Sequence, residues 1–314
     1  MLLLATMVWL AGCTGSDGDD VQTPDPSTED IHLSADVWQV MDGTRATTFD
    51  NADALQTEGA FTCTAYEKNT TTAFISGTSV NWNTTTGEWL FSDGKHYWPS
   101  GALDFFAYMP ATPPDYITGP TYTGTPENHT VSFTCSSLPM TQAGQESSSL
   151  KEFVYALALD QDKNGTNDTA QPMPGQVSLT FRHPFARIKL QWAASPYDHS
   201  SITLTSVKLK GIENSGTYNS SATPQWTATG DATDLTVTSL AENGAAVPYL
   251  VIPQEWTGDI EVIASWTVWG ETKESTLTAN VGTTTWEPGT SYTYTFTITD
   301  TDLKVDIGKF TEQW

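Results

Sequence analysis

Alternation between large apolar and small hydroxyl side chains is the feature that most constrains how this chain can fold. From residue 291 to residue 299, every aromatic or aliphatic residue has an even number and every Ser or Thr has an odd number. A β-strand with one buried face and one wet face requires this period of two. Residues 187–192 repeat the pattern, with Arg187 and Lys189 expected on the solvent-facing side.

Further segments show the same alternation or short runs of β-branched and aromatic residues. These strand candidates are residues 31–40, 60–66, 89–91, 103–109, 153–159, 177–181, 202–209, 249–252 and 260–269. Within 202–209 the apolar residues change from even to odd numbers near Ser206, which predicts a bulge or a bend. Only residues 51–56 have a helical pattern. Many short strands between turn residues indicate an all-β sandwich architecture.

Composition excludes one class of partner and supports a folded protein. The chain has 13 Lys and Arg against 37 Asp and Glu, a formal net charge of −24, so binding to nucleic acid is not expected. Twelve Trp and an aromatic share of 11% are too many for a disordered acidic chain. Roughly 285 residues follow residue 29, a length that suggests two domains. The aperiodic stretch 160–175 places them at residues 30–165 and 166–314.

The N-terminus reads as an export signal. An uncharged apolar run from Met1 ends in Leu-Ala-Gly followed by Cys13, and it is shorter than the ~20 residues of a spanning helix. This tetrapeptide resembles a bacterial lipobox, which makes residues 1–12 a signal peptide and Cys13 a lipidated N-terminus. No basic residue precedes the run, which an upstream start codon would explain. Residues 13–29 are acidic and rich in Pro, Ser and Thr, and we expect a disordered linker.

Two further cysteines, Cys63 and Cys135, form an even pair in an oxidising compartment. If bridged, they close a loop of about 72 residues and stabilise the fold by roughly 4 kcal/mol. The alternative is two separate buried thiols, and the sequence leaves both open. Two thiols alone lack the third and fourth ligands that a zinc site needs.

The sequence carries no catalytic motif, so we expect a protein that is not an enzyme and needs no cofactor. HExxH, GxSxG and phosphate-binding glycine loops are missing, and the five histidines are scattered. Asp160, Asp162, Asn164 and Asp168 match the first half of a calcium loop. The twelfth position is Gln171 instead of Glu and no helix flanks the loop, which favours a solvated turn between domains over a metal site.

Several segments, in order along nearly the whole mature chain, resemble the Bacteroidales fimbrillin family, which comprises the type V pilins and their relatives. They are residues 44–48, 54–66, 97–99, 103–110, 179–188, 209–218, 250–254 and 286–292. The acidic run after Cys13 also resembles the tag that sends lipoproteins of this order to the outer face of the outer membrane. The resemblance implies two tandem transthyretin-like β-sandwich domains, export through the periplasm as a lipoprotein, and assembly into adhesive surface fimbriae.

The family also implies proteolytic activation. Its members are cut by an Arg-specific protease after an arginine that follows the first strand. In this chain the cut falls after Arg45, so that Ala46 becomes the new N-terminus and the strand expected at 31–40 is lost. A missing strand leaves unpaired amides and carbonyls, which template the strand of another chain.

The C-terminal tail, residues 302–314, is the candidate donor of that strand. Leu303, Val305 and Ile307 alternate as a strand with one apolar face requires. The alternative is that the tail is the last strand of its own sandwich, because alternation does not distinguish pairing within a chain from pairing between chains.

The leading hypothesis is therefore a structural or adhesive fimbrial subunit, acting as stalk, tip or anchor. Its expected partners are other fimbrial subunits through strand addition, the outer membrane through the lipid, and a receptor or glycan on a host or bacterial surface. The alternative is a surface glycan-binding lipoprotein that does not polymerise. Trp82, Trp89 and Trp98 are its expected exposed stacking residues, because they lie among Asn, Thr and Gly.

Overall fold

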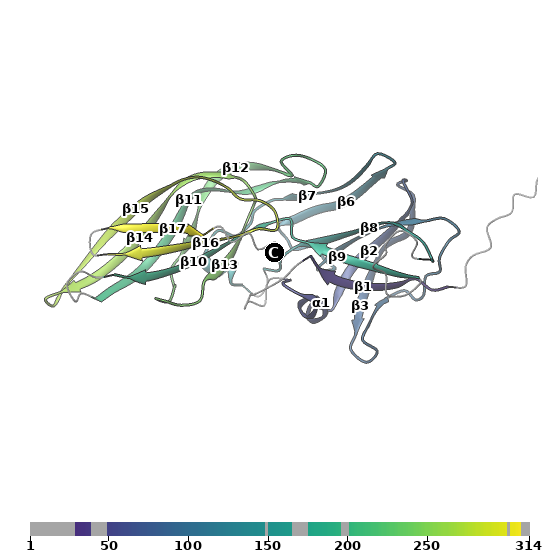
Figure 1. Ribbon diagram of the computed structural model, residues 1–314, viewed down its shortest axis with the longest axis horizontal. Coiled ribbons are helices and arrows are strands. Elements are labelled where there is room, and N and C mark those ends of the chain that lie inside the picture. Colours follow the sequence, from purple (N-terminus) through teal and green to yellow (C-terminus); the bar gives the residue numbers. More distant parts are fainter. Residues whose placement is uncertain are drawn as a thin grey trace, which may run out of the picture.

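A computed structural model describes residues 29–38, 49–147, 150–164, 175–195, 201–299 and 302–308. The predicted sites at Cys13, Arg45, Ala46 and Asp168 lie outside these residues. The fold is all-β, as expected, with 63% strand and 4% helix. Two β units lie end to end along the long axis of the molecule (Figure 1). None of the helices in the described residues is long and apolar enough to span a membrane.

The first unit is a closed barrel in which the strand order is β1-β4-β3-β2-β5-β8-β9. Its strands are β1 (His32–Val37), β2 (Ala60–Glu67), β3 (Ala73–Asn83), β4 (Glu88–Phe91), β5 (Leu103–Met109), β8 (Val154–Gln161) and β9 (Gln176–Arg182). Alternate residues of these strands fill the interior, among them Phe61, Phe105 and Phe181. The unit differs from the expected open sandwich because β1 bridges the gap between β4 and β9.

The short helix α1 (Ala52–Glu58) packs beside the barrel and begins where the sequence predicts it. The side chain of Asn51 caps it by accepting a hydrogen bond from the backbone N of Ala54 at 2.9 Å. Gly59 ends it in the left-handed conformation, at φ 82°, which glycine adopts without steric cost. Leu55 is its fully buried residue.

The second unit packs one sheet in the order β13-β10-β16-β17 against another in the order β15-β14-β11-β7-β6. The strands not yet described are β6 (Ile117–Thr125), β7 (Asn128–Cys135), β10 (Ala186–Ala194), β11 (Ser201–Asn219), β12 (Trp226–Val237), β13 (Val247–Val251), β14 (Glu255–Val268), β15 (Glu271–Thr285), β16 (Ser291–Ile298) and β17 (Leu303–Gly308). The register of β11 against β14 shifts between Leu204 and Ser206, which confirms the predicted bulge.

A shared sheet joins the two units. The hairpin of β6 (Ile117–Thr125) and β7 (Asn128–Cys135) comes from the first half of the chain, yet β7 pairs with the end of β11. An aromatic cluster that includes Phe133, Phe153 and Trp226 fills the space beneath. The predicted boundary between residues 165 and 166 therefore does not separate the units. β6 and β7 precede this boundary in sequence but belong to a sheet of the second unit. β9 follows the boundary but belongs to the barrel.

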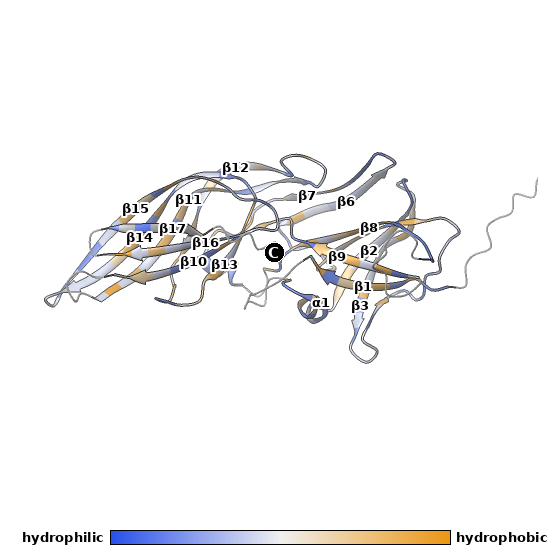
Figure 2. Ribbon diagram, in the orientation of Figure 1, coloured by the Kyte–Doolittle hydropathy of each residue, from blue (hydrophilic) through white to orange (hydrophobic). Residues whose placement is uncertain are grey.

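Every strand expected from alternation is present in the described residues, and most ends are shifted by a few positions. The exception is β11, which continues to Asn219 instead of ending at residue 209. The strands that sequence patterns did not indicate are β3, β6, β7, β12 and β15, all of them rich in polar residues. β15 is the extreme case, with mostly exposed side chains along its length. Figure 2 shows that orange and pale or blue residues alternate along the strands of the second unit. A strand at the edge of a sheet, with one face in water, carries few apolar residues, so a period of two is hard to recognise in its sequence.

Candidate functional site: the first strand and its groove

β1 is held in the barrel mainly from one side. It pairs in parallel with β9 along its whole length, from His32 opposite Gln176 to Val37 opposite Phe181. Beyond its end, the backbone N of Trp38 donates to the carbonyl of Phe181 at 2.8 Å. On the other side, the described part of the barrel pairs β1 with β4 at a single position. The backbone ladder of β9 therefore carries most of the attachment.

The side chains of β1 alternate as a strand closing a barrel requires. Ile31, Leu33 and Val37 are buried in the barrel core, whereas His32 and Asp36 are exposed. Burial of each large apolar side chain contributes about 1.5–3 kcal/mol. The barrel core is thus completed by residues that precede Arg45.

A groove remains where β1 and β4 diverge. A cavity of about 310 Å³ lies beside β1, and its lining includes Leu33, Ala35, Gln56, Trp82 and Trp89. Ala35 is the smallest of the inward-facing residues of β1 and is only partly buried. The groove therefore opens to solvent beside the partly buried side chain of Ala35.

The C-terminal end of β1 lies over a polar pocket. The guanidinium carbon of Arg182 lies 5.4 Å from the ring centre of Trp38, and the indole is 48% exposed. Trp38 and Arg182 share a cavity of about 260 Å³ with Tyr155 and Tyr218. The hydroxyls of these two tyrosines lie 2.7 Å apart.

Beyond the undescribed residues 39–48, buried charges anchor the chain. Glu152 accepts a hydrogen bond from the backbone N of Phe49 at 3.2 Å, and its other carboxylate oxygen lies 2.6 Å from Nδ1 of His183. Arg187 donates to Asp50 at 2.8 Å through Nη1 and to Ser291 at 2.9 Å through Nε. The segment that begins at Phe49 is therefore fixed to both units.

The buried ion pair of Arg187 and Asp50 corrects one expectation from the sequence. Alternation placed Arg187 on the solvent-facing side of its strand, but its side chain is almost fully buried. The reason is a partner far away in sequence, since the carboxylate of Asp50 neutralises the guanidinium inside the protein. A signal was present in the arginine and histidine that interrupt the apolar run 179–188. Their partners were not visible in the sequence.

The tail forms a strand of the second unit. β17 pairs antiparallel with β16, from Leu303 opposite Ile298 to Gly308 opposite Thr293, and lies beside β15. Within the described residues it is the last strand of its sheet. The structure thus shows the alternative in which the tail belongs to its own sandwich. A donor role for Leu303, Val305 and Ile307 stays a prediction.

The molecule thus has a first strand that pairs mainly with β9, a segment after it that is anchored by buried charges, and a C-terminal tail that forms an edge strand. The family model of the fimbrillin-like proteins matches residues 44–314. The chain belongs to the fimbrillin-like family. This membership supports an adhesive fimbrial subunit at the cell surface that interacts with other fimbrial subunits.

Solved structures share the fold of this fimbrillin-like chain. A fimbrial protein from Bacteroides vulgatus ATCC 8482 superposes with a TM-score of 0.58 at 13% identity, over 90% of this chain and 100% of that chain. A candidate cell adhesion protein from Bacteroides uniformis ATCC 8492 gives a TM-score of 0.52 at 16% identity, over 91% of this chain and 100% of that chain. No curated protein matches the sequence.

Cys63 and Cys135 of this fimbrillin-like chain are free thiols. Cys63 lies in the barrel core and Cys135 in the cluster between the units, so the second of the two sequence alternatives is the one observed. Burial raises the pKa of each thiol to about 12. Both therefore remain protonated and unreactive at neutral pH.

The tryptophans expected to form an exposed stacking platform do not form one. Trp89 and Trp98 are 6% and 1% exposed, and Trp82 is half-buried with its ring centre 5.3 Å from that of Trp89. Trp82 and Trp89 face inward in β3 and β4, and Trp98 packs into the barrel core from the connection between β4 and β5. Other large side chains are exposed, including Tyr97 and Trp269, and the latter is 98% exposed at the tip of the β14–β15 hairpin.

The predicted calcium loop is a hydrogen-bonded turn in the residues described. Asp160 forms an ion pair with Lys68 at 2.5 Å, and Asp162 accepts a hydrogen bond from the backbone N of Asn164 at 2.8 Å. The described residues contain no cluster of three or more side chains able to hold a metal ion. These contacts use the carboxylates for local structure.

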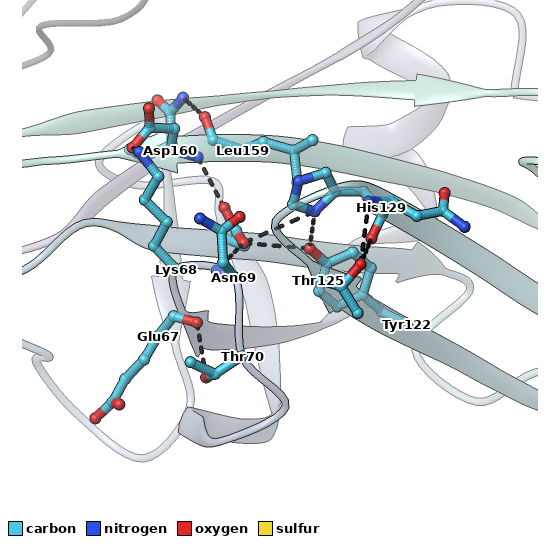
Figure 3. A network of polar contacts seen from close by, with 12 residues as sticks. Glu67, Lys68, Asn69, Thr70, Tyr122, Thr125, His129, Leu159 and Asp160 are labelled. Atoms are coloured by element: carbon cyan, nitrogen blue, oxygen red, sulfur yellow. Dashed lines mark hydrogen bonds and ion pairs between the residues drawn. The ribbon is translucent and has the colours of Figure 1, made fainter.

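Next to this turn, a polar network ties the β6–β7 hairpin to the barrel (Figure 3). The buried carboxylate of Asp104 accepts hydrogen bonds from the backbone N of Asn69 and of Asp160, at 3.0 and 2.9 Å. The hydroxyl of Tyr122 donates to Asp104 at 3.3 Å and lies 2.6 Å from Nδ1 of His129. Burial, helped by the charge of Asp104, raises the pKa of Tyr122. The hairpin is thereby held against the barrel.

Proposed function

We propose that this protein is an adhesive fimbrial subunit that polymerises by strand exchange after a cut behind Arg45. The observation that carries the proposal is the place of β1. It completes a closed barrel, but its covalent connection to the other strands runs only through residues 39–48. A single cut in that link leaves β1 held by non-covalent contacts alone.

The distribution of arginine supports a specific cut. The chain has three arginines, at positions 45, 182 and 187. Arg182 lies in β9 and Arg187 in β10, where ladder hydrogen bonds hold the backbone in pairs with other strands. Proteases need an extended segment that is free to enter their active site. Arg45 is the arginine that lies outside the described strands.

Loss of β1 would expose a groove that another strand can fill. Val177, Leu179 and Phe181 of β9 are fully buried, and they would border the opened barrel. The backbone of β9 would lose its partner along the same length. An exposed edge of this kind binds an added strand through main-chain hydrogen bonds. Without β1 the unit would also become an open sandwich, in keeping with two tandem transthyretin-like domains.

The buried anchor would keep the cut subunit in shape. Because Phe49 and Asp50 stay bonded to Glu152 and Arg187, the new N-terminus at Ala46 would be tethered close to the groove. The junction between the units would not depend on β1. Only the strand that precedes the cut would leave.

The proposed role of the lipid differs between stalk and anchor subunits of a fibre. We propose that Cys13 anchors the uncut protein in the outer membrane after export through the periplasm. In a stalk subunit the lipid would leave together with β1. In an anchor subunit Arg45 would stay intact, and Cys13 would hold the fibre to the cell. Mass spectrometry of the protein isolated from cells distinguishes the two cases. The chain of a stalk subunit would begin at Ala46, and the chain of an anchor subunit would begin at Cys13.

The central experiment treats lipid-free Cys13→Ser protein with an Arg-specific protease. We expect a ladder of oligomers after the cut, measured by light scattering and native gels. The control is Arg45→Ala, which should stay intact and monomeric. A second variant that lacks residues 303–314 should be cut but remain monomeric. If the cut wild-type chain stays monomeric with its tail present, assembly by strand exchange is wrong.

A further inference from the structure

The first strand and the tail carry the same side-chain pattern. Residues 33–40 read Leu-Ser-Ala-Asp-Val-Trp-Gln-Val, and residues 303–310 read Leu-Lys-Val-Asp-Ile-Gly-Lys-Phe. Both begin with Leu and have Asp in the fourth position. Both carry apolar residues in the third, fifth and eighth positions. The two segments therefore present equivalent faces when superposed residue by residue.

Other alignments of the two segments fail at buried positions. A shift of two residues in one direction puts Thr301 in the place of buried Leu33, and the opposite shift puts Lys309 in the place of buried Val37. A shift of one residue turns the apolar face of the strand outward. The aligned register keeps charged residues out of the barrel core and places one small polar residue there, Thr301 in the position of buried Ile31.

In this register the side chains of the tail are larger than those of β1 beside the groove between β1 and β4. Val305 replaces Ala35, beside which lies the cavity of about 310 Å³. Ile307 replaces Val37, whose side chain is buried. Each additional carbon that becomes buried tightens binding about fourfold. A second copy's tail thus fills a space that the chain's own first strand leaves open.

We propose that the groove selects the tail of a second copy in one register, with Leu303, Val305 and Ile307 in the places of Leu33, Ala35 and Val37. This inference rests on the proposed assembly by strand exchange. The tail runs parallel to β9, as β1 does, and the cavity beside Ala35 is the pocket that favours Val305. Gly308 then takes the place of Trp38, so the ring that covers Arg182 is lost on assembly.

Engineered cysteines in the full chain test the register. Asp36 pairs with Thr180 across the β1–β9 ladder, so the proposed register puts Asp306 opposite Thr180. Thr180→Cys with Asp306→Cys should form disulfide-linked oligomers after the cut at Arg45. The matched control is Thr180→Cys with Lys304→Cys, which the register places two residues away, and it should cross-link little.

The outcomes separate the register from the assembly itself. Oligomers that cross-link through position 304 instead of 306 overturn the register while leaving strand exchange intact. A chain that is cut and forms no oligomers in either variant overturns the proposed function together with this inference. Cross-linked oligomers through position 306 alone support both.

Three substitutions, one of them a control, test the pocket beside Ala35. Val305→Ala should speed dissociation of assembled oligomers on the order of tenfold, because two buried carbons are lost. Lys304→Ala, on the opposite face of the same strand, should change it less than twofold. In the uncut chain, Ala35→Val should raise the thermal midpoint and, after the cut, slow replacement of β1. A lower midpoint for Ala35→Val, or equal effects of the two tail variants, overturns the pocket.

Discussion

The barrel and the sandwich each have a strand near one end of the chain, and the two strands are held differently. β1 lies between β9 and β4 and contributes buried side chains to a closed core. β17 ends its sheet and pairs with β16 alone within the described residues. Loss of β1 opens a core, whereas loss of β17 shortens a sheet by its outermost strand. Strand exchange requires one strand whose loss opens a core and a second strand that can leave its own sheet without opening one.

A charge placed at equivalent positions should separate the two strands most clearly. Leu33→Asp puts a carboxylate into the barrel core and should lower the free energy of unfolding by about 4 kcal/mol. Leu303→Asp, at the start of the edge strand, should lower it by about 1 kcal/mol. Urea unfolding of both uncut variants measures the difference. Equal losses would mean that β17 is as integral to its unit as β1.

The anchor between the units should be the next most sensitive part. Asp50→Ala leaves the buried guanidinium of Arg187 without its carboxylate and should cost about 3 kcal/mol. The control is Lys210→Ala, which removes a partly exposed ion pair with Glu261 and should cost about 0.5 kcal/mol. Chemical denaturation at neutral pH compares them. A small loss for Asp50→Ala would show that the units are joined by the shared sheet alone.

Alkaline pH should weaken the barrel through Cys63. Its folded pKa is about 12, above the ordinary value of 9.0, so the folded state keeps a proton that the unfolded chain releases. Stability from this group is therefore complete below pH 9 and is lost as the pH rises toward 12. At pH 10.5 the loss is about 2 kcal/mol. Cys63→Ala should show a correspondingly shallower decline between pH 8 and 10.5, and an unchanged decline would contradict the prediction.

The smallest effect is expected at the far tip of the second unit. Trp269 and Gly270 form the turn of the β14–β15 hairpin at φ 54° and 83°. Asn is favoured at such a position and Trp is not, so Trp269→Asn should stabilise the protein by about 0.5 kcal/mol. Trp269→Ala, which retains the strain, is the control. A lower thermal midpoint for the Asn variant would mean that the exposed indole stabilises the tip.

Local patterns predicted much of the fold because the period of two belongs to each strand by itself. The strands at 103–109 and 291–298, the bulge near Ser206 and the start of α1 all follow from neighbouring residues. The polar strand β15 was missed because Leu277, Ala279 and Val281 are its only alternating apolar residues and the rest of the strand is polar. The closure of the barrel was missed because pairing of β1 with β9 joins residues more than 140 positions apart.

The candidate site was predicted in its parts but not in its arrangement. The sequence indicated a first strand before Arg45 and an alternating tail, and it suggested stacking roles for Trp89 and Trp98 that the structure places in the core. The anchor formed by Asp50, Glu152 and Arg187 was not anticipated. A charged residue in an alternating strand reads as exposed unless its buried partner is known.

By itself, the sequence determined the class of the fold and the family, since alternation and ordered motifs are properties of the chain read in one direction. Only the tertiary structure decided that β1 closes a barrel, that β17 pairs with β16 at the edge of a sheet, and that Arg187 is buried. Hydrogen-bond partners and local polarity depend on what lies beside a strand in space. The same alternating pattern therefore serves an integral strand at one end of the chain and an edge strand at the other.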